Sequence, residues 1–281
     1  MTVSSIDNSD PLNIYIGNPE LQPEYLHDFR LNFNSFDQFS SISIFVAANA
    51  TFTNHKIVNA RTIDEQFRQT IQPINFGETT RYSSYLSFGA PVKFLKSRIN
   101  LTADFDYNQG NYLVNELNNP FKNKTTSLDA NLTNKNTELI ELAIGYKWTR
   151  NGIDYDRDIQ QNQTYNNQIF YTDFALNLGE NWTISSTIDY TRYSNASFGE
   201  ATDIALWKAG IEHRFLKDKR GTLSLSGNDL LNQNLGINRY SQLNFVQEQR
   251  ITSLGRYFML SFTYALSAFG NDSGIEVVKR R

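Results

Sequence analysis

The chain has 281 residues and a formal net charge of −3, so its charge does not suggest nucleic acid as a partner, and we expect none. It has no cysteine, which excludes a disulfide framework and any thiolate site. The 20 Phe, 15 Tyr and 3 Trp occur with a mean hydropathy of −0.48, so apolar residues are numerous but spread out singly. No run approaches the roughly 18 apolar residues of a transmembrane helix.

The chain begins with a polar, acidic segment over residues 1–10. It has neither the basic start nor the apolar centre of a secretory signal peptide, so we expect none here. We interpret residues 1–23 as an external loop that leads into the first long strand.

From residue 24 to residue 267, apolar and polar residues alternate in segment after segment. A period of two predicts strands with one apolar and one polar face. We expect about eleven strands, the third broken near Pro73 because proline cannot donate to a sheet ladder. The expected strands lie near 24–34, 41–54, 67–89, 98–108, 124–134, 138–149, 164–178, 182–193, 204–215, 221–228 and 256–267.

Short and long connections alternate between these strands. The short ones lie near 35–40, 90–97, 135–137, 179–181 and 216–220, and the long ones near 55–66, 109–123, 150–163, 194–203 and 229–255. Short turns on one rim and long loops on the other are typical of transmembrane barrels, whose short turns are periplasmic. Aromatic residues also fall at the expected strand ends, as interfacial girdles do: Tyr107, Trp148, Trp182, Tyr190, Tyr193, Phe215 and Tyr257. A soluble β-sandwich or solenoid would explain the alternation equally well, but not these two features.

The sequence therefore predicts an all-β, antiparallel transmembrane β-barrel. Charged residues at mid-strand would be costly against lipid, so we expect them to face a watered lumen. The predicted lumen-lining residues are Arg30, Asp104, Asp106, Asp129, Glu141, Lys147, Asp173, Asp189, Lys208, Glu212 and Arg214. These charges either form salt bridges along the wall or line a substrate path, and the pattern alone leaves both open.

No pattern of catalytic or metal-binding residues is visible. His27, His55 and His213 match no metal spacing. Asp104 and Asp106 lie on one strand face, about 7 Å apart by the strand rise, which is loose for a paired-carboxylate hydrolase. Asp154, Asp156 and Asp158 could offer oxygens to Ca²⁺, but Ile159 stands where such a loop needs glycine. We expect no enzyme activity, no metal and no cofactor.

Two segments resemble a known family. Residues 7–24, with Gly-Asn-Pro-x-Leu-x-Pro-Glu at 17–24, closely resemble a loop-and-strand signature of TonB-dependent receptor barrels, in particular the related outer-membrane barrels of Bacteroidetes. Residues 255–264 resemble the final strand of the same family, and Lys279, Arg280 and Arg281 resemble its basic tail. Residues 228–232 look like the pattern near its last hairpin. The resemblance implies an insertion signal for the barrel-assembly machinery at Tyr257, Phe258, Leu260, Phe262 and Tyr264.

The resemblance further implies a receptor-like transporter in the bacterial outer membrane that takes up a nutrient, with outer-membrane lipid around it and a periplasmic C-terminus. Barrels of this kind have about 22 strands, a plug and further N-terminal parts. We therefore expect the chain to be the C-terminal half of such a barrel, with strands over 24–267 and a periplasmic basic tail over 268–281. The missing half-barrel and plug would be its partners, and TonB would act through that plug. A structural or adhesive barrel without transport is the alternative.

Overall fold

The computed structural model describes residues 6–10, 13–134, 138–157, 162–195, 202–234, 237–242, 245–250 and 254–266. Most strands belong to one sheet of 15 strands, and two more form a separate hairpin. The all-β prediction is therefore confirmed, and the pairing is mostly antiparallel. No helix in the described part of the chain is long and apolar enough to cross a membrane.

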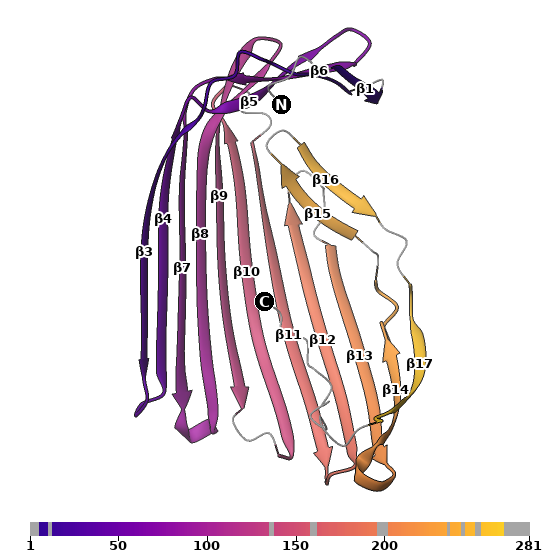
Figure 1. The fold of residues 1–281 in the computed structure, drawn as a ribbon. Coiled ribbons are helices and arrows are strands. Elements are labelled where there is room, and N and C mark those ends of the chain that lie inside the picture. The colour runs from indigo at the N-terminus through magenta and orange to yellow at the C-terminus, as the bar shows by residue number, and fades with distance from the viewer. Residues whose placement is uncertain are drawn as a thin grey trace.

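Long strands form a curved wall in which each strand pairs antiparallel with the next (Figure 1). In order across the wall they are β3 (Tyr25–Asp37), β4 (Ile42–Asn54), β7 (Thr79–Val92), β8 (Ser97–Val114), β9 (Leu117–Asn134), β10 (Ile140–Tyr155), β11 (Gln163–Leu178), β12 (Trp182–Asn195), β13 (Thr202–Phe215), β14 (Gly221–Asn228) and β17 (Tyr257–Tyr264).

The two rims of the wall differ as the loop lengths predict. Short connections at 38–41, 93–96, 179–181 and 216–220 share one rim, at the bottom of Figure 1, two of them with the short helices η1 (Lys93–Leu95) and η4 (Lys217–Lys219). Gly179 there has φ of 61°, a left-handed conformation that glycine adopts without strain. The connection at 135–137 lies outside the described residues; the strand ends that flank it, Asn134 of β9 and Ile140 of β10, lie at this rim. The longer excursions all leave from the opposite rim.

Short strands gather at the long-connection rim. They are β1 (Ile6–Asp10), β2 (Asn13–Ile16), β5 (Ile57–Ile63), β6 (Gln69–Asn75), β15 (Ile237–Gln242) and β16 (Phe245–Arg250). Strands β1, β5 and β6 run across the top of the wall in Figure 1. Strand β2 pairs parallel with β6 and so joins β1 to the β5–β6 hairpin, and β5 joins this group to the wall by pairing with β8 at Arg61 and Val114. We call β1, β2, β5 and β6 the rim sheet.

The predicted strand count was wrong, chiefly at this rim. The segment 67–89 is two strands, β6 and β7, separated at 76–78, and the expected loops 55–66 and 229–255 contain further strands. The expected loop 109–123 is mostly strand, because β8 and β9 continue to a two-residue turn at 115–116. Where both faces of a strand are wet, the backbone ladder can continue although the apolar alternation stops.

Pairing register sorts the wall side chains onto two faces. Tyr146 in β10 lies opposite Ala130 in β9 and Phe170 in β11, and every second residue follows it onto an apolar face. The exposure is inverted relative to a soluble protein: Ile188 on the apolar face is 42% exposed, whereas the next residue, Asp189, is 8% exposed. Large apolar side chains are exposed along this face in β3, β7, β8, β10, β12, β14 and β17. The apolar face therefore needs an apolar surrounding.

The sheet does not close on itself. Among the described residues β3 pairs only with β4, and β17 pairs only with β14. Every residue of β3 is exposed, and so is nearly every residue of β17. Two edge strands thus have one side of their backbone without a partner in the part of the chain that the structure describes.

Candidate functional site

The polar face of the wall is the candidate site. All of the predicted lumen-lining residues lie on it: Arg30, Asp104, Asp106, Asp129, Glu141, Lys147, Asp173, Asp189, Lys208, Glu212 and Arg214. Asp129 lies opposite Lys147, for example, although they are separated in sequence by a turn. Glu212 and Asp189 are buried, which fits the concave side of a curved sheet, where side chains converge. That this face lines a watered lumen stays a prediction.

Several of these charges are held by partners along the wall. Arg81 binds Asp106 through Nη2 at 2.6 Å and Nε at 3.0 Å, and Arg214 Nε lies 2.9 Å from Glu212. Arg30 Nε donates to Asp28 at 2.6 Å. The sequence prediction missed Arg81, although its alternation with Thr80 and Tyr82 could have identified it. These ion pairs are of the kind that the first alternative, salt bridging along the wall, predicts, and a substrate path along the wall stays a prediction.

Two long polar side chains lie across glycines. Tyr171 in β11 passes over Gly145 in β10, and its hydroxyl donates to the carboxylate of Asp129 in β9 at 3.1 and 3.3 Å. A Cβ on Gly145 would lie 2.1 Å from Tyr171 Cζ. Arg98 in β8 crosses Gly89 in β7 in the same way, since a Cβ there would lie 2.2 Å from Arg98 Nη2. Each side chain therefore ties three strands together on the polar face.

Arg98 crosses Gly89 and forms hydrogen bonds that link several strands of the wall. Its Nη1 donates to the Ser41 carbonyl at 2.7 Å and its Nη2 to Ser43 Oγ at 2.5 Å, both in or beside β4. Its Nε donates to Asn100, whose amide donates to Asn131 in β9 at 2.9 Å. This chain of contacts spans the wall from β4 to β9 near the short-turn rim.

No catalytic geometry is visible among the described residues of the polar face. Asp106 is engaged by Arg81, while Asp104 lies opposite Tyr85 and Ser127 rather than a second acid. His27 lies in β3, His55 between β4 and β5, and His213 stacks on Trp182 with ring centroids 4.1 Å apart. Among the described residues no three His, Cys, Asp or Glu side chains gather as a metal site.

The suggested calcium loop is only partly described. Asp158 lies outside the described residues. Asp156 instead pairs with Lys122, 3.2 Å from Oδ1 to Nζ, and Asp154 lies opposite Lys122 in the ladder. Both carboxylates are exposed at the long-connection rim.

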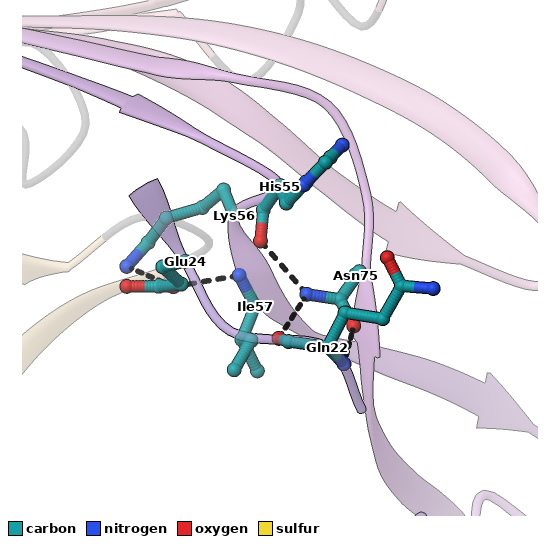
Figure 2. Close-up of polar contacts among 6 residues, drawn as sticks. All are labelled: Gln22, Glu24, His55, Lys56, Ile57 and Asn75. Atoms are coloured by element: carbon teal, nitrogen blue, oxygen red, sulfur yellow. Dashed lines mark hydrogen bonds and ion pairs between the residues drawn. The ribbon is translucent and has the colours of Figure 1, made fainter. Parts of the chain in front are cut away.

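The Gly-Asn-Pro-x-Leu-x-Pro-Glu run at 17–24 has a clear structural role. Figure 2 shows its second half meeting the base of the β5–β6 hairpin. Gln22 N donates to Asn75 Oδ1 at 2.7 Å, and Asn75 Nδ2 donates to the carbonyls of Gln22 and His55 at 2.9 and 2.8 Å. Asn18 Nδ2 donates to the Pro73 carbonyl at 3.0 Å. We call these contacts, with those of Glu24, the rim clamp.

Glu24 completes the rim clamp where β3 begins. One carboxylate oxygen accepts from Lys56 Nζ at 2.8 Å and from Ile57 N at 2.7 Å. The hydrogen bond from Lys56, followed by that from Ile57, holds the pKa of Glu24 below its usual value of 4.5. The hairpin leaves the wall through a sharp turn at His55, whose φ is 52°. The clamp fixes the direction in which the rim sheet departs from the wall.

The rim sheet has a second attachment at the tip of the β8–β9 hairpin. Asn115 N donates to the Arg61 carbonyl at 2.8 Å, and Ile63 N donates to Asn115 Oδ1 at 2.7 Å. Asn115 and Glu116 have φ of 49° and 64°, which the two-residue turn between twisted strands requires. The β5–β6 hairpin of the rim sheet is thereby held at its base by the rim clamp and further along β5 by Asn115.

The predicted insertion signal lies in β17. Phe258, Leu260, Phe262 and Tyr264 are on the apolar face, opposite residues 227, 225, 223 and 221 of β14, while Tyr257 lies on the polar face. Phe258 and Leu260 are 67% and 69% exposed. Recognition of this strand by the assembly machinery stays a prediction, and the basic tail at 268–281 lies outside the described residues.

The comparison with protein families agrees with this architecture. The model of a family described as "Outer membrane protein beta-barrel family" matches residues 4–151 and 137–264. Among solved structures, the chain is similar to CdiB from Acinetobacter baumannii at 11% identity and TM-score 0.34, over 87% of this chain and 47% of that one, so it spans about half of CdiB. It is also similar to in-vitro folded OmpT, an outer membrane protein of Vibrio cholerae, at 8% identity and TM-score 0.34, over 86% of this chain and 96% of OmpT.

The comparison with curated proteins returned no match. The family match covers nearly all of the described wall and the rim sheet, and it accounts for a sheet whose exposed face is apolar. The chain belongs to the outer membrane protein beta-barrel family.

Proposed function

We propose that this chain forms part of the barrel wall of a receptor-like transporter of the TonB-dependent class, which takes up a nutrient across the outer membrane. The observation that carries the proposal is the direction of the two edge strands. Strands reverse at each step from β3 to β17, and both edges run from the long-connection rim towards the short-turn rim. Pairing them directly would give a parallel seam.

An antiparallel closure instead needs further strands between β17 and β3. The strand next to β17 and the strand next to β3 must both run from the short-turn rim towards the long-connection rim. An open edge in lipid is costly, because each unpaired N–H or C=O costs several kcal/mol there. A large barrel with a plug supplies such strands, so a second stretch of wall and a plug are the proposed partners, with TonB acting through the plug. The resemblance of residues 7–24 and 255–264 to receptor barrels supports the same class.

Closure can be tested on the chain itself. We expect residues 1–281, refolded in detergent, to give neither a heat-modifiable monomer on gels nor a steady single-channel conductance, because the edges stay unpaired. A heat-modifiable monomer with steady conductance would show that β3 and β17 close the wall directly, and the larger barrel would have to be abandoned.

Transport needs a test in cells. In the producing bacterium, removing the protein should abolish the uptake of one class of labelled nutrient. A protonophore should abolish the same uptake in the parent strain, since a TonB-dependent step draws on the proton gradient. If no nutrient uptake changes and surface attachment falls instead, the chain serves a structural or adhesive barrel.

A further inference from the structure

The apolar face changes character sharply on one pair of strands. Going towards the long-connection rim along β9 and β10, the outward pairs are Leu128 with Trp148, then Thr126 with Arg150, then Lys124 with Gly152. Leu128, Arg150 and Lys124 are all exposed. Two cations thus lie directly above the last apolar pair, on the face that needs an apolar surrounding.

Lys124 and Arg150 are diagonal neighbours in this ladder, so their side chains can reach the same group. Neither makes an ion pair with a carboxylate in the part of the chain that the structure describes. Lys124 Nζ instead lies 6.0 Å from the ring centre of Tyr107, which is stacked on Tyr82. The neighbouring outward positions in β8 and β11 hold neutral Gln109 and Asn166.

Acidic groups lie at the next outward position of the ladder towards the long-connection rim. Lys122 lies opposite Asp154 and forms an ion pair with Asp156, and among the described residues no ion pair joins Asp154 to Lys124. We call Lys124 and Arg150, with the rings of Tyr107 and Trp148 beside them, the cationic shelf. Its rings mark the interface between hydrocarbon and headgroups, where aromatic side chains gather.

The depth of the apolar band is consistent with this placement. On β12 the outward aromatic residues are Trp182 near one rim and Tyr190 towards the other. Eight residues of strand, tilted by about 40°, cover roughly 20 Å of depth, against an apolar band of about 25 Å in outer-membrane barrels. Tyr190 lies opposite Phe170, which lies opposite Tyr146, so this aromatic row reaches β10 one outward position below Trp148.

We propose that the cationic shelf binds the phosphate group of a lipid headgroup in the outward-facing leaflet. The long connections assign this rim to the outside. A phosphate at headgroup depth would meet the guanidinium of Arg150 as a two-pronged donor and the ammonium of Lys124 as a point charge. The acyl chains of the same lipid would lie along Leu128 and Trp148 below, so one amphipathic lipid complements both parts of the surface.

The test uses the full protein, extracted from outer membranes and held in micelles of dodecyl maltoside, a detergent that carries no phosphate. Lipid A is titrated in, with lipid A stripped of its phosphates as the comparison, and bound lipid is counted by native mass spectrometry. We expect the unaltered protein to prefer the phosphorylated form. The K124Q/R150Q variant should bind it at least about tenfold more weakly, the scale expected for one to two charges at an anionic surface.

The matched control is K93Q/K217Q, which removes the same charge from exposed turns at the opposite rim and should bind as the unaltered protein does. Equal binding of lipid A by K124Q/R150Q and by the control would overturn the proposal. Failure of the unaltered protein to distinguish the two lipids would also overturn it, and that comparison needs no variant to fold.

Discussion

The contact of Tyr171 across Gly145 allows a sharp test of how the polar face is built. In the Gly145→Ala variant the new Cβ would lie 2.1 Å from Tyr171 Cζ and 2.3 Å from its hydroxyl oxygen. The ring is rigid, so it has to swing away as a whole, and its hydroxyl then leaves Asp129. A hydrogen bond to a charged group contributes about 1.5–3 kcal/mol. Alanine in a strand recovers about 0.5–1 kcal/mol relative to glycine. The expected net loss is about 0.5–2.5 kcal/mol.

The assay is urea unfolding of the protein in detergent micelles, followed by tryptophan fluorescence. Gly152→Ala is the matched control, because Gly152 lies on the same strand and a Cβ there meets only Thr164 Oγ1 at 3.6 Å, an ordinary contact. In a Tyr171→Phe background, which already lacks the hydroxyl, Gly145→Ala should cost less. Equal unfolding free energies for Gly145→Ala and Gly152→Ala would refute the role assigned to the glycine.

Three further predictions concern the rim. Glu24→Gln should raise the rate of tryptic cleavage in the β5–β6 hairpin about tenfold, because the carboxylate loses its charge-assisted bond to Lys56, whereas Glu20→Gln at an exposed position should not. The pKa of Glu24 is lowered in the folded protein, so its contribution to the stability of the rim clamp is complete above pH 4.5 and is lost as the pH falls through the folded pKa. Cleavage by an acid-active protease should therefore rise at acidic pH in the parent protein but not in Glu24→Gln. Asn115→Ala should increase hydrogen exchange at the amide of Ile63, which then lacks its acceptor, and unchanged exchange would contradict the second attachment.

The wall could be predicted from sequence because the membrane imposes a period of two on it. Leu142, Ile144 and Tyr146 lie on the apolar face with Ile211, Leu260 and Phe262, as the alternation requires. The charged residues fall on the other face for the same reason. Each of these assignments rests on local pattern alone.

The rim could not be predicted in this way, because apolar and polar residues do not alternate strictly along its strands, as Ile-Val-Asn-Ala at 57–60 in β5 shows. The bond between Gln22 and Asn75 joins residues 53 positions apart, and nothing local to either signals it. Pro73 was expected to break a strand, but it lies within β6, beyond the residues that pair with β2. A proline there leaves no ladder bond to β2 unmade.

Glycines posed a different difficulty. In a strand pattern Gly89 and Gly145 look like weak points. Their role depends on Arg98 and Tyr171, which come from the neighbouring strand, so only the register shows it.

The central claim is that the two faces of the wall meet different surroundings, water on the polar face and lipid on the other. The chain has no cysteine, so single replacements give clean probes. Thr187 and Ile188 are adjacent in the middle of β12 and point to opposite faces. In outer membranes containing the full protein, T187C should react with a water-soluble, membrane-impermeant maleimide, and I188C should react only with a lipid-soluble reagent. The reverse pattern, or equal reaction of both with the water-soluble reagent, would contradict the account.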